Sequence, residues 1–216
     1  AVKEGGADPD TNPRLRTAMQ NAKGANMPKD TIERTVKKAS GADGTSYEEV
    51  TFEGYASNGV AVFVECTTDN NNRTVANIRA IFSKYGGNLG TNGSLEFIFD
   101  RKGVFTIAAE KVGMDLEEFE MELIDGGLEE LEKEGEIVLV YTNFTDFSAM
   151  QKKLEELGIE LQSAELQRIP NSTKALDVDK SKSVLNMIDK FEEDDDVQNV
   201  FHNLEMTEEL MIALEQ

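Results

Sequence analysis

The residues best suited to binding a ligand lie in the segment TTDNNNRTVANIR, residues 67–79, where a run of polar residues precedes one arginine. Asp69, Asn70, Asn71 and Asn72 are each good helix N-caps, so the run exceeds what one helix start needs. Free backbone N–H groups at a helix start suit contacts with phosphates or base edges. The pattern predicts a nucleic-acid contact, although composition alone allows a capped, solvated surface helix equally well.

The helix expected at 72–85 turns its polar residues away from its apolar stripe of Val75, Ile78, Phe82 and Tyr85. The predicted contact residues at this site are Asn70, Asn72, Arg73, Asn77, Arg79 and Lys84.

Arg73 is predicted to be the principal anchor of that contact. It lies in the first turn, opposite the apolar stripe, so it need not serve the core. Its planar fork can hold a phosphate with two hydrogen bonds. A competing interpretation makes Arg73 a structural clamp, paired with Asp69 or with Glu53.

A second basic surface is predicted over residues 14–38, in a chain whose formal net charge is −20. The segment carries a net charge of +5, whereas residues 110–136 and 192–216 carry −10 and −9. Such asymmetry suggests an anionic partner for one end only, and protein partners for the acidic surfaces. Its bases are Arg14, Arg16, Lys23, Lys29, Arg34, Lys37 and Lys38.

Catalysis finds little support in the sequence. The one histidine, His202, lies in an expected strand, where a packed or surface residue is the usual interpretation, and no common catalytic or nucleotide-binding motif is present. The run EEDDD at 192–196 could hold a divalent cation, but a solvated helix end is favoured. The sequence therefore predicts a protein with no catalytic residues, no metal, no cofactor and no small-molecule substrate. A metal-dependent hydrolase using Asp194 to Asp196 is a weak alternative.

The composition of the chain and its hydropathy pattern predict a cytoplasmic protein. No apolar run approaches the length of a membrane span, and no secretory signal is present. The only cysteine, Cys66, excludes an internal disulfide and lies in the strand-like run VAVFVECTT, so it is expected in the core.

Hydrophobic periodicity predicts three domains. Residues 1–42 are helical, with stripes in PRLRTAMQNAKG and PKDTIERTVKKAS ended by Gly41 and Gly44. Residues 103–170 contain a βαββαβ pattern in which LEELEKEG is ambiguous. Residues 43–102 give strands EEVTFEGYA, GVAVFVECTT and SLEFIFDR and the helix at 72–85, and residues 171–216 add one helix and one strand. These two segments are expected to form one discontinuous α/β domain, into which 103–170 is inserted.

Several long motifs occur in order: NMPKDTIERTVKK, FEGYASNGVAVFVECTTDNNNRT, FSKYGGNLG, FDRKG and EEDDDVQNVFHNLEM. Together they resemble the YebC/PmpR family. Its members are called probable transcriptional regulators and include the mitochondrial translational activator of cytochrome c oxidase subunit I. The resemblance implies an α+β fold of three domains, a helical N-terminal domain and two ferredoxin-like (split βαβ) α/β domains, one inserted in the other. It also implies a further basic helical segment before Ala1, so we expect residues 1–216 alone to bind nucleic acid more weakly than a form that includes that segment.

These observations predict a non-enzymatic regulator of gene expression that binds DNA, a probable transcriptional regulatory protein. The alternative is a ribosome-associated translation factor that binds ribosomal RNA or tRNA, because no recognition helix with a clear base-reading set is visible. A protein–protein adaptor acting through the two acidic surfaces is a third, weaker possibility.

Overall fold

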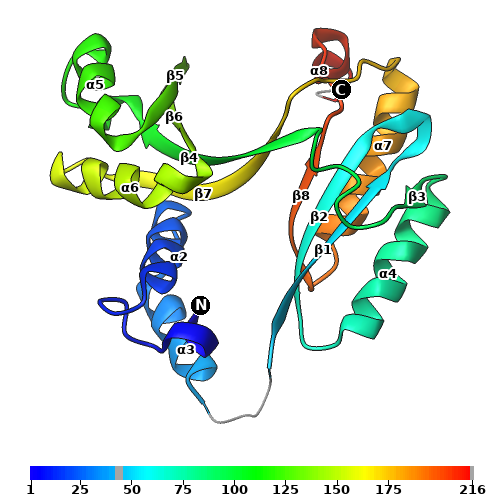
Figure 1. The fold of residues 1–216 in the computed structure, drawn as a ribbon, viewed down its shortest axis with the longest axis horizontal. Coiled ribbons are helices and arrows are strands. Elements are labelled where there is room, and N and C mark those ends of the chain that lie inside the picture. The colour runs from blue at the N-terminus through cyan, green and yellow to red at the C-terminus, as the bar shows by residue number, and fades with distance from the viewer. Residues whose placement is uncertain (42–45, 215–216) are drawn as a thin grey trace. The chain divides into compact units, whose positions relative to one another are not determined.

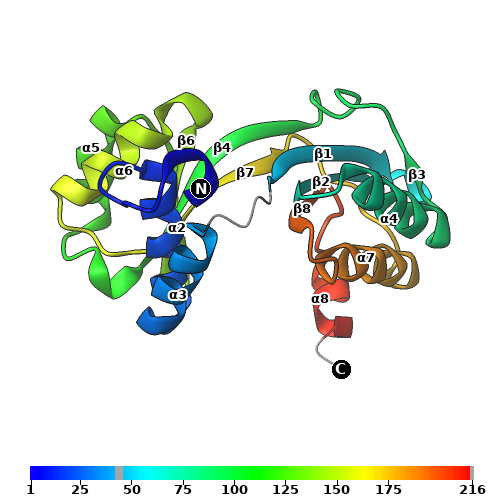
Figure 2. The same ribbon diagram turned by 90° about the horizontal axis from the view of Figure 1, so that it is seen from below.

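The computed structural model describes residues 1–41 and 46–214, and it contains two compact units (Figures 1 and 2). The N-terminal unit comprises Ala1–Gly44 and Arg101–Gln167, and the C-terminal unit comprises Thr45–Asp100 and Arg168–Gln216. The boundary predicted between residues 42 and 43, like the helix stop predicted at Gly44, lies outside the described residues. The three-domain division itself stays a prediction.

The C-terminal unit is built on a sheet of strand order β3-β1-β2-β8. Strand β1 (Glu48–Tyr55) pairs antiparallel with β2 (Ala61–Thr68) and with β3 (Asn88–Leu89), so β1 separates two parallel strands. Helix α4 (Asn71–Lys84) connects β2 to β3 and completes a split βαβ unit. Strand β8 (Val197–His202) extends the sheet beside β2.

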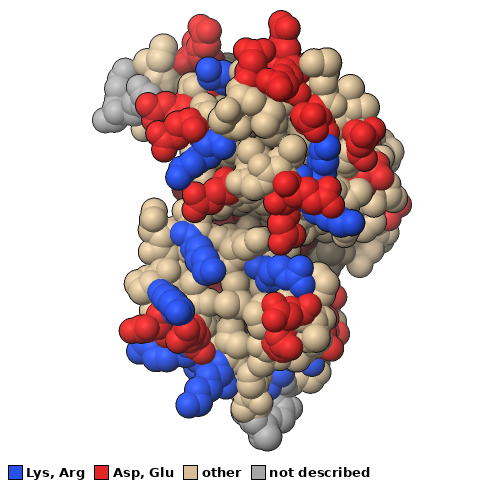
Figure 3. All heavy atoms as spheres, turned by 90° about the vertical axis from the view of Figure 1, so that its left-hand side faces the viewer, with Lys and Arg blue, Asp and Glu red and all other residues tan. Residues whose placement is uncertain are grey.

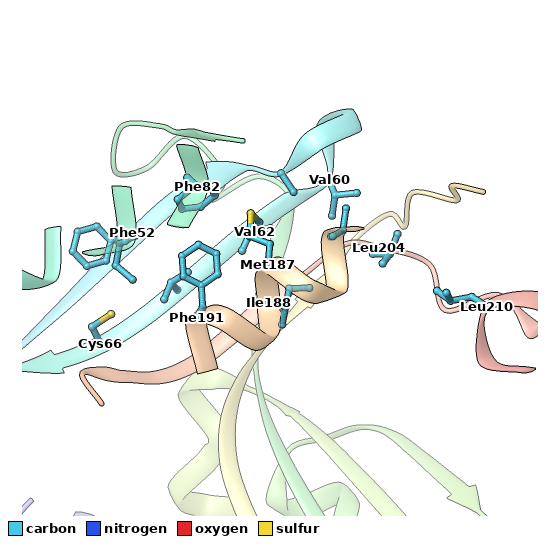
Figure 4. Close-up of a cluster of buried hydrophobic side chains, with 14 residues drawn as sticks. Phe52, Val60, Val62, Cys66, Phe82, Met187, Ile188, Phe191, Leu204 and Leu210 are labelled. Carbon is cyan, nitrogen blue, oxygen red and sulfur yellow. The ribbon is translucent and has the colours of Figure 1, made fainter. Parts of the chain in front are cut away.

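Helices α4 and α7 (Val178–Glu192) supply the core on one face of this sheet. Phe82 of α4 and Phe191 of α7 are fully buried, with ring centroids 4.9 Å apart, and Val62 and Met187 pack in the same cluster (Figure 4). The expected apolar stripe of the 72–85 helix therefore does point into the core. A short helix, α8 (Glu208–Leu214), follows β8 and was not predicted.

The prediction of a strand at SLEFIFDR, residues 94–101, is wrong for its first half. Residues 92–98 form turns, and the strand begins only at Phe99. The cause is Glu53, a buried residue whose carboxylate accepts hydrogen bonds from the backbone N–H of Gly93 at 2.7 Å and Leu95 at 2.6 Å. These bonds hold the chain in a turn, and Leu95 is buried there against Phe63 and Phe99 on the other face of the sheet.

The N-terminal unit contains the predicted βαββαβ pattern. Its elements are β4 (Phe99–Ala108), α5 (Leu116–Leu123), β5 (Leu128–Glu134), β6 (Ile137–Asn143), α6 (Phe147–Glu156) and β7 (Leu161–Pro170). The strand order is β5-β6-β4-β7, the ferredoxin-like arrangement, and the ambiguous segment LEELEKEG is strand β5.

Three helices of the N-terminal segment belong to the same unit: α1 (Val2–Gly5), α2 (Pro13–Gly24) and α3 (Lys29–Ala39). Helix α2 lies against the edge strand β7. The side chain of Asn21 donates to the Ala164 carbonyl oxygen at 2.9 Å and accepts from the Ala164 N–H at 2.9 Å, so it imitates a neighbouring strand. Because Gly24 has no side chain, the backbones approach closely there, and an added Cβ would lie 1.8 Å from the Gln162 carbonyl oxygen.

Candidate nucleic-acid interface

Helix α3 presents its bases to solvent. Ile32 is the buried residue of this helix. The predicted contact residues are all exposed: Lys29, Arg34, Lys37 and Lys38. Lys29 lies 3.6 Å from Glu33, and the Arg34 guanidinium donates to the Asp30 carbonyl oxygen of the same helix at 3.2 Å. The structure therefore brings these four cations together on one short helix.

The bases of α2 are used differently. Arg14 forms an ion pair with Glu4 at 2.6 Å. Arg16 is half-buried and donates to the backbone carbonyl oxygens of Pro9 and Asp10, at 3.1 and 2.9 Å, so it braces the loop before the helix. Lys23 is exposed in the last turn. In the face drawn in Figure 3, Lys and Arg side chains gather over the lower part, while Asp and Glu dominate the upper part.

The start of α4 is capped as predicted by one asparagine. The Asn70 side chain accepts from the Arg73 N–H at 3.2 Å. Arg73 lies outside the core, as predicted, and its side chain is 47% exposed. Its guanidinium donates to both carboxylate oxygens of Asp196, at 2.7 and 2.8 Å, and to Asp69 at 2.9 Å, and its contact with nucleic acid stays a prediction. The pairing with Asp69 that the clamp interpretation expected is present, the bonds to Asp196 add to it, and Glu53 is engaged elsewhere.

Asp196 is a buried carboxylate at the centre of a polar cluster. It accepts from the hydroxyl groups of Thr74 at 2.7 Å and Thr68 at 3.2 Å, and both threonines are fully buried. The Arg73 hydrogen bonds hold the pKa of Asp196 below its ordinary value, and the bonds from Thr74 and Thr68 act in the same direction. The cluster joins the start of α4 to the segment before β8.

The remaining predicted residues of α4 divide into two groups. The Asn77 amide donates to Asp194 at 3.0 Å, so it also faces the acidic run. Asn72, Arg79 and Lys84 are exposed, and the Lys84 ammonium lies 5.6 Å from the centroid of the Tyr85 ring. Sequence reasoning missed Asp196, which is 123 residues from Arg73 and belongs to a run of acids that resembles a solvated helix end.

The cysteine and the histidine of this chain are both withdrawn from solvent. Cys66 is a core residue, as predicted, and burial raises the pKa of its thiol to about 12. His202 is half-buried, burial lowers its pKa, and its Nδ1 atom has no hydrogen-bond partner among the described residues. Within residues 1–41 and 46–214 no group of three or more His, Cys, Asp or Glu residues is arranged to hold a metal ion. No helix in this part of the chain is both long and apolar enough to cross a membrane.

The two four-stranded sheets and the exposed basic helix α3 define a multidomain α+β protein. Family profiles match nearly the whole chain: the N-terminal domain of TACO1/YebC proteins matches residues 1–42, and the second and third domains match residues 47–204. The chain therefore belongs to the TACO1/YebC family, as its motifs suggested.

Individual relatives support the same family assignment. A protein of Cytophaga hutchinsonii named "Probable transcriptional regulatory protein" is 53% identical over 96% of this chain and 87% of its own length. Another with that name, from Porphyromonas gingivalis, is 51% identical over 96% of this chain and 86% of its own length. The crystal structure of a conserved hypothetical protein from Aquifex aeolicus is similar in fold, with a TM-score of 0.80 and 40% identity over 95% of this chain and 84% of that chain.

Proposed function

We propose that this protein is a non-enzymatic regulator of gene expression that acts in the cytoplasm and binds DNA through helix α3. The observation that supports the proposal most strongly is the group of four exposed cations on one helix of a chain whose net charge is −20. The relatives named probable transcriptional regulatory proteins point in the same direction.

The physical basis is attraction between α3 and the phosphate backbone. Lys37 and Lys38 lie in the last turn of α3, and Arg34 lies one turn earlier. Each Lys or Arg that neutralises a phosphate releases condensed counterions, which gives affinity without reading the sequence. The acidic regions repel the same backbone, so the contact must be local to this helix. The acidic surfaces are proposed to face protein partners instead.

The second candidate is a translation factor that binds ribosomal RNA or tRNA. It is favoured by the engagement of Arg73 with Asp196 and Asp69, because this removes the best base-reading side chain from the start of α4. The contacts that remain suit phosphates, which duplex DNA and structured RNA both present.

The test is a titration of one duplex DNA and one RNA hairpin over a series of salt concentrations. The double variant Lys37→Gln/Lys38→Gln should lower affinity for the functional target and reduce the slope of log affinity against log salt by about one unit per lost phosphate contact. Lys133→Gln, at an exposed position of strand β5, is the control that removes a positive charge away from α3. Equal slopes for both variants would remove α3 from the contact, and a clear preference for the hairpin would select the translation factor.

A further inference from the structure

The N-terminal unit contains a cleft that neither the α3 contact nor the family assignment explains. It has a volume of about 730 Å³ and lies between helix α2, helix α6 and the start of strand β7. This volume falls within the range of small-molecule sites, roughly 300–1,000 Å³.

The walls of the cleft are fixed by specific contacts. On one side, Asn21 of α2 holds both backbone groups of Ala164 in β7. On the other, the amide of Gln151 in α6 donates to the Thr17 hydroxyl at 3.0 Å and to the Gln20 side chain at 3.2 Å. These contacts set the distances from α2 to β7 and to α6, so the cleft is part of the packing of this unit.

The charges that line the cleft favour an anion. Arg16 and Lys23 lie seven residues apart on α2, which places them two helical turns apart on one side, and Lys152 of α6 lines the same space. Of the two acids in the lining, Glu160 is ion-paired with Lys111 at 3.1 Å, so Glu155 is the main opposing charge. Lys152 lies 3.6 Å from Glu156, but both side chains are well exposed and such pairs are weak.

The rest of the lining suits a flat, partly polar group. Ile159 and Leu161, both half-buried, form an apolar part of the wall, and the Ser148 hydroxyl and Gln20 amide supply hydrogen-bonding groups. A phosphate alone would leave most of the volume unfilled. A base and its sugar could pack on the apolar part while the phosphate meets the cations.

We propose that this cleft binds a nucleoside phosphate, either as a free nucleotide or as a terminal or unpaired nucleotide of a strand. Lys23 holds the phosphate from α2 and Lys152 holds it from α6. Arg16, whose guanidinium also braces the loop before α2, adds positive charge beside them, and the base packs on Ile159 and Leu161. The site differs from the α3 surface, because it recognises one nucleotide in a concave pocket and not a run of phosphates along a backbone. It can therefore fail or hold independently of the proposed function.

The experiment is a calorimetric titration of the full chain with adenosine 5′-monophosphate, adenosine, inorganic phosphate and a 5′-phosphorylated penta-adenylate. We expect the monophosphate to bind, and adenosine and phosphate each to bind at least about tenfold more weakly, since each lacks one half of the contacts. Lys23→Glu should weaken the monophosphate at least about tenfold. The control Lys133→Glu, at the opposite edge of the sheet, should leave its affinity unchanged.

Ser148→Trp, which fills the cleft without changing charge, should also abolish binding. If the penta-adenylate binds more tightly than the monophosphate and loses that advantage in Lys23→Glu, the cleft binds a nucleotide of a strand. If the monophosphate binds more tightly than the penta-adenylate, the cleft binds a free nucleotide. Failure of the monophosphate to bind, equal binding of inorganic phosphate, or equal loss in Lys23→Glu and Lys133→Glu would overturn the proposal. None of these variants changes helix α3, so the results do not bear on the proposed binding of nucleic acid by α3.

Discussion

The polar cluster around Asp196 gives the sharpest prediction about the fold. Replacing Asp196 with alanine removes the acceptor of the Thr68 and Thr74 hydroxyl groups, which are fully buried, and the partner of the Arg73 guanidinium. If the start of α4 were only a ligand-binding surface, this change would have little effect on stability. The structure instead makes Asp196 the link between α4 and the segment that leads into β8.

The magnitude follows from the individual contacts. Each of the two buried hydroxyl bonds contributes about 0.5–1.5 kcal/mol net. The Arg73 side chain is 47% exposed, against 11% for Asp196, so the contribution of this pair is discounted toward the small value of surface pairs. The Thr74 hydroxyl can still donate to the Asn70 carbonyl oxygen, 3.1 Å away, so part of the lost hydrogen-bond free energy is recovered. We expect Asp196→Ala to lower the free energy of unfolding by about 2 kcal/mol.

The assay is urea unfolding of Asp196→Ala beside Asp195→Ala, a change of the same chemistry at the exposed neighbouring residue. Asp195→Ala should leave stability within about 0.5 kcal/mol of the unchanged chain. A double-mutant cycle with Arg73→Ala should show coupling between residues 73 and 196. Equal stability of the two aspartate variants, or additive effects in the cycle, would refute the clamp interpretation of Arg73.

Four other results are expected. Lys37→Gln/Lys38→Gln should reduce the salt dependence of DNA binding while leaving the melting temperature unchanged, as measured by fluorescence anisotropy and thermal scans. Burial lowers the folded-state pKa of His202, so the stability that its neutral form contributes is complete above the unfolded pKa of about 6.5 and is lost as pH falls through the folded pKa. The free energy of unfolding should therefore fall between pH 7 and 5.5, and the non-titrating variant His202→Asn should lack this part of the pH dependence. Gly24→Ala should separate α2 from β7 and cost about 1–3 kcal/mol by urea unfolding, because its Cβ would lie 1.8 Å from a carbonyl oxygen. Replacing residues 103–170 with a short Gly/Ser linker should leave residues 43–102 and 171–216 cooperatively folded as one unit by calorimetry, and a molten product would contradict the predicted insertion.

Local pattern predicted most of the regular elements. The stripe of Val75, Ile78 and Phe82 placed α4 to within a residue at each end, because side chains three and four apart on a helix share a face. The succession of strands and helices in residues 103–170 predicted a βαββαβ unit, and the family resemblance implied its ferredoxin-like fold, which the strand order β5-β6-β4-β7 bears out. The segment LEELEKEG could not be assigned, because its glutamates suit a helix and only pairing with β6 makes it a strand.

The errors share a long-range cause. SLEFIFDR has strand-like residues, but a carboxylate 40 residues earlier, on Glu53, fixes the N–H of Gly93 and turns the chain. The spacing around Arg73 did not reveal its pairing with Asp196, because local spacing shows which face of a helix a residue occupies and not which distant residue meets it. Asp196 belongs to a run of acids that resembles a solvated helix end, and only the fold shows that it is buried. The position of α2 against β7 also depends on contacts, through Asn21, that no periodicity reveals.

The most direct test of the nucleic-acid proposal is crosslinking in cells, followed by sequencing of the nucleic acid that is recovered. The chain is compared with a Lys37→Glu/Lys38→Glu variant of α3 and with the Lys133→Glu control. We expect promoter DNA to be enriched with the unchanged chain and the control, and to be lost with the α3 variant. Enrichment of ribosomal RNA or tRNA in the same pattern would assign α3 to the translation-factor alternative. Recovery that is equal for all three proteins would contradict the claim that α3 binds nucleic acid.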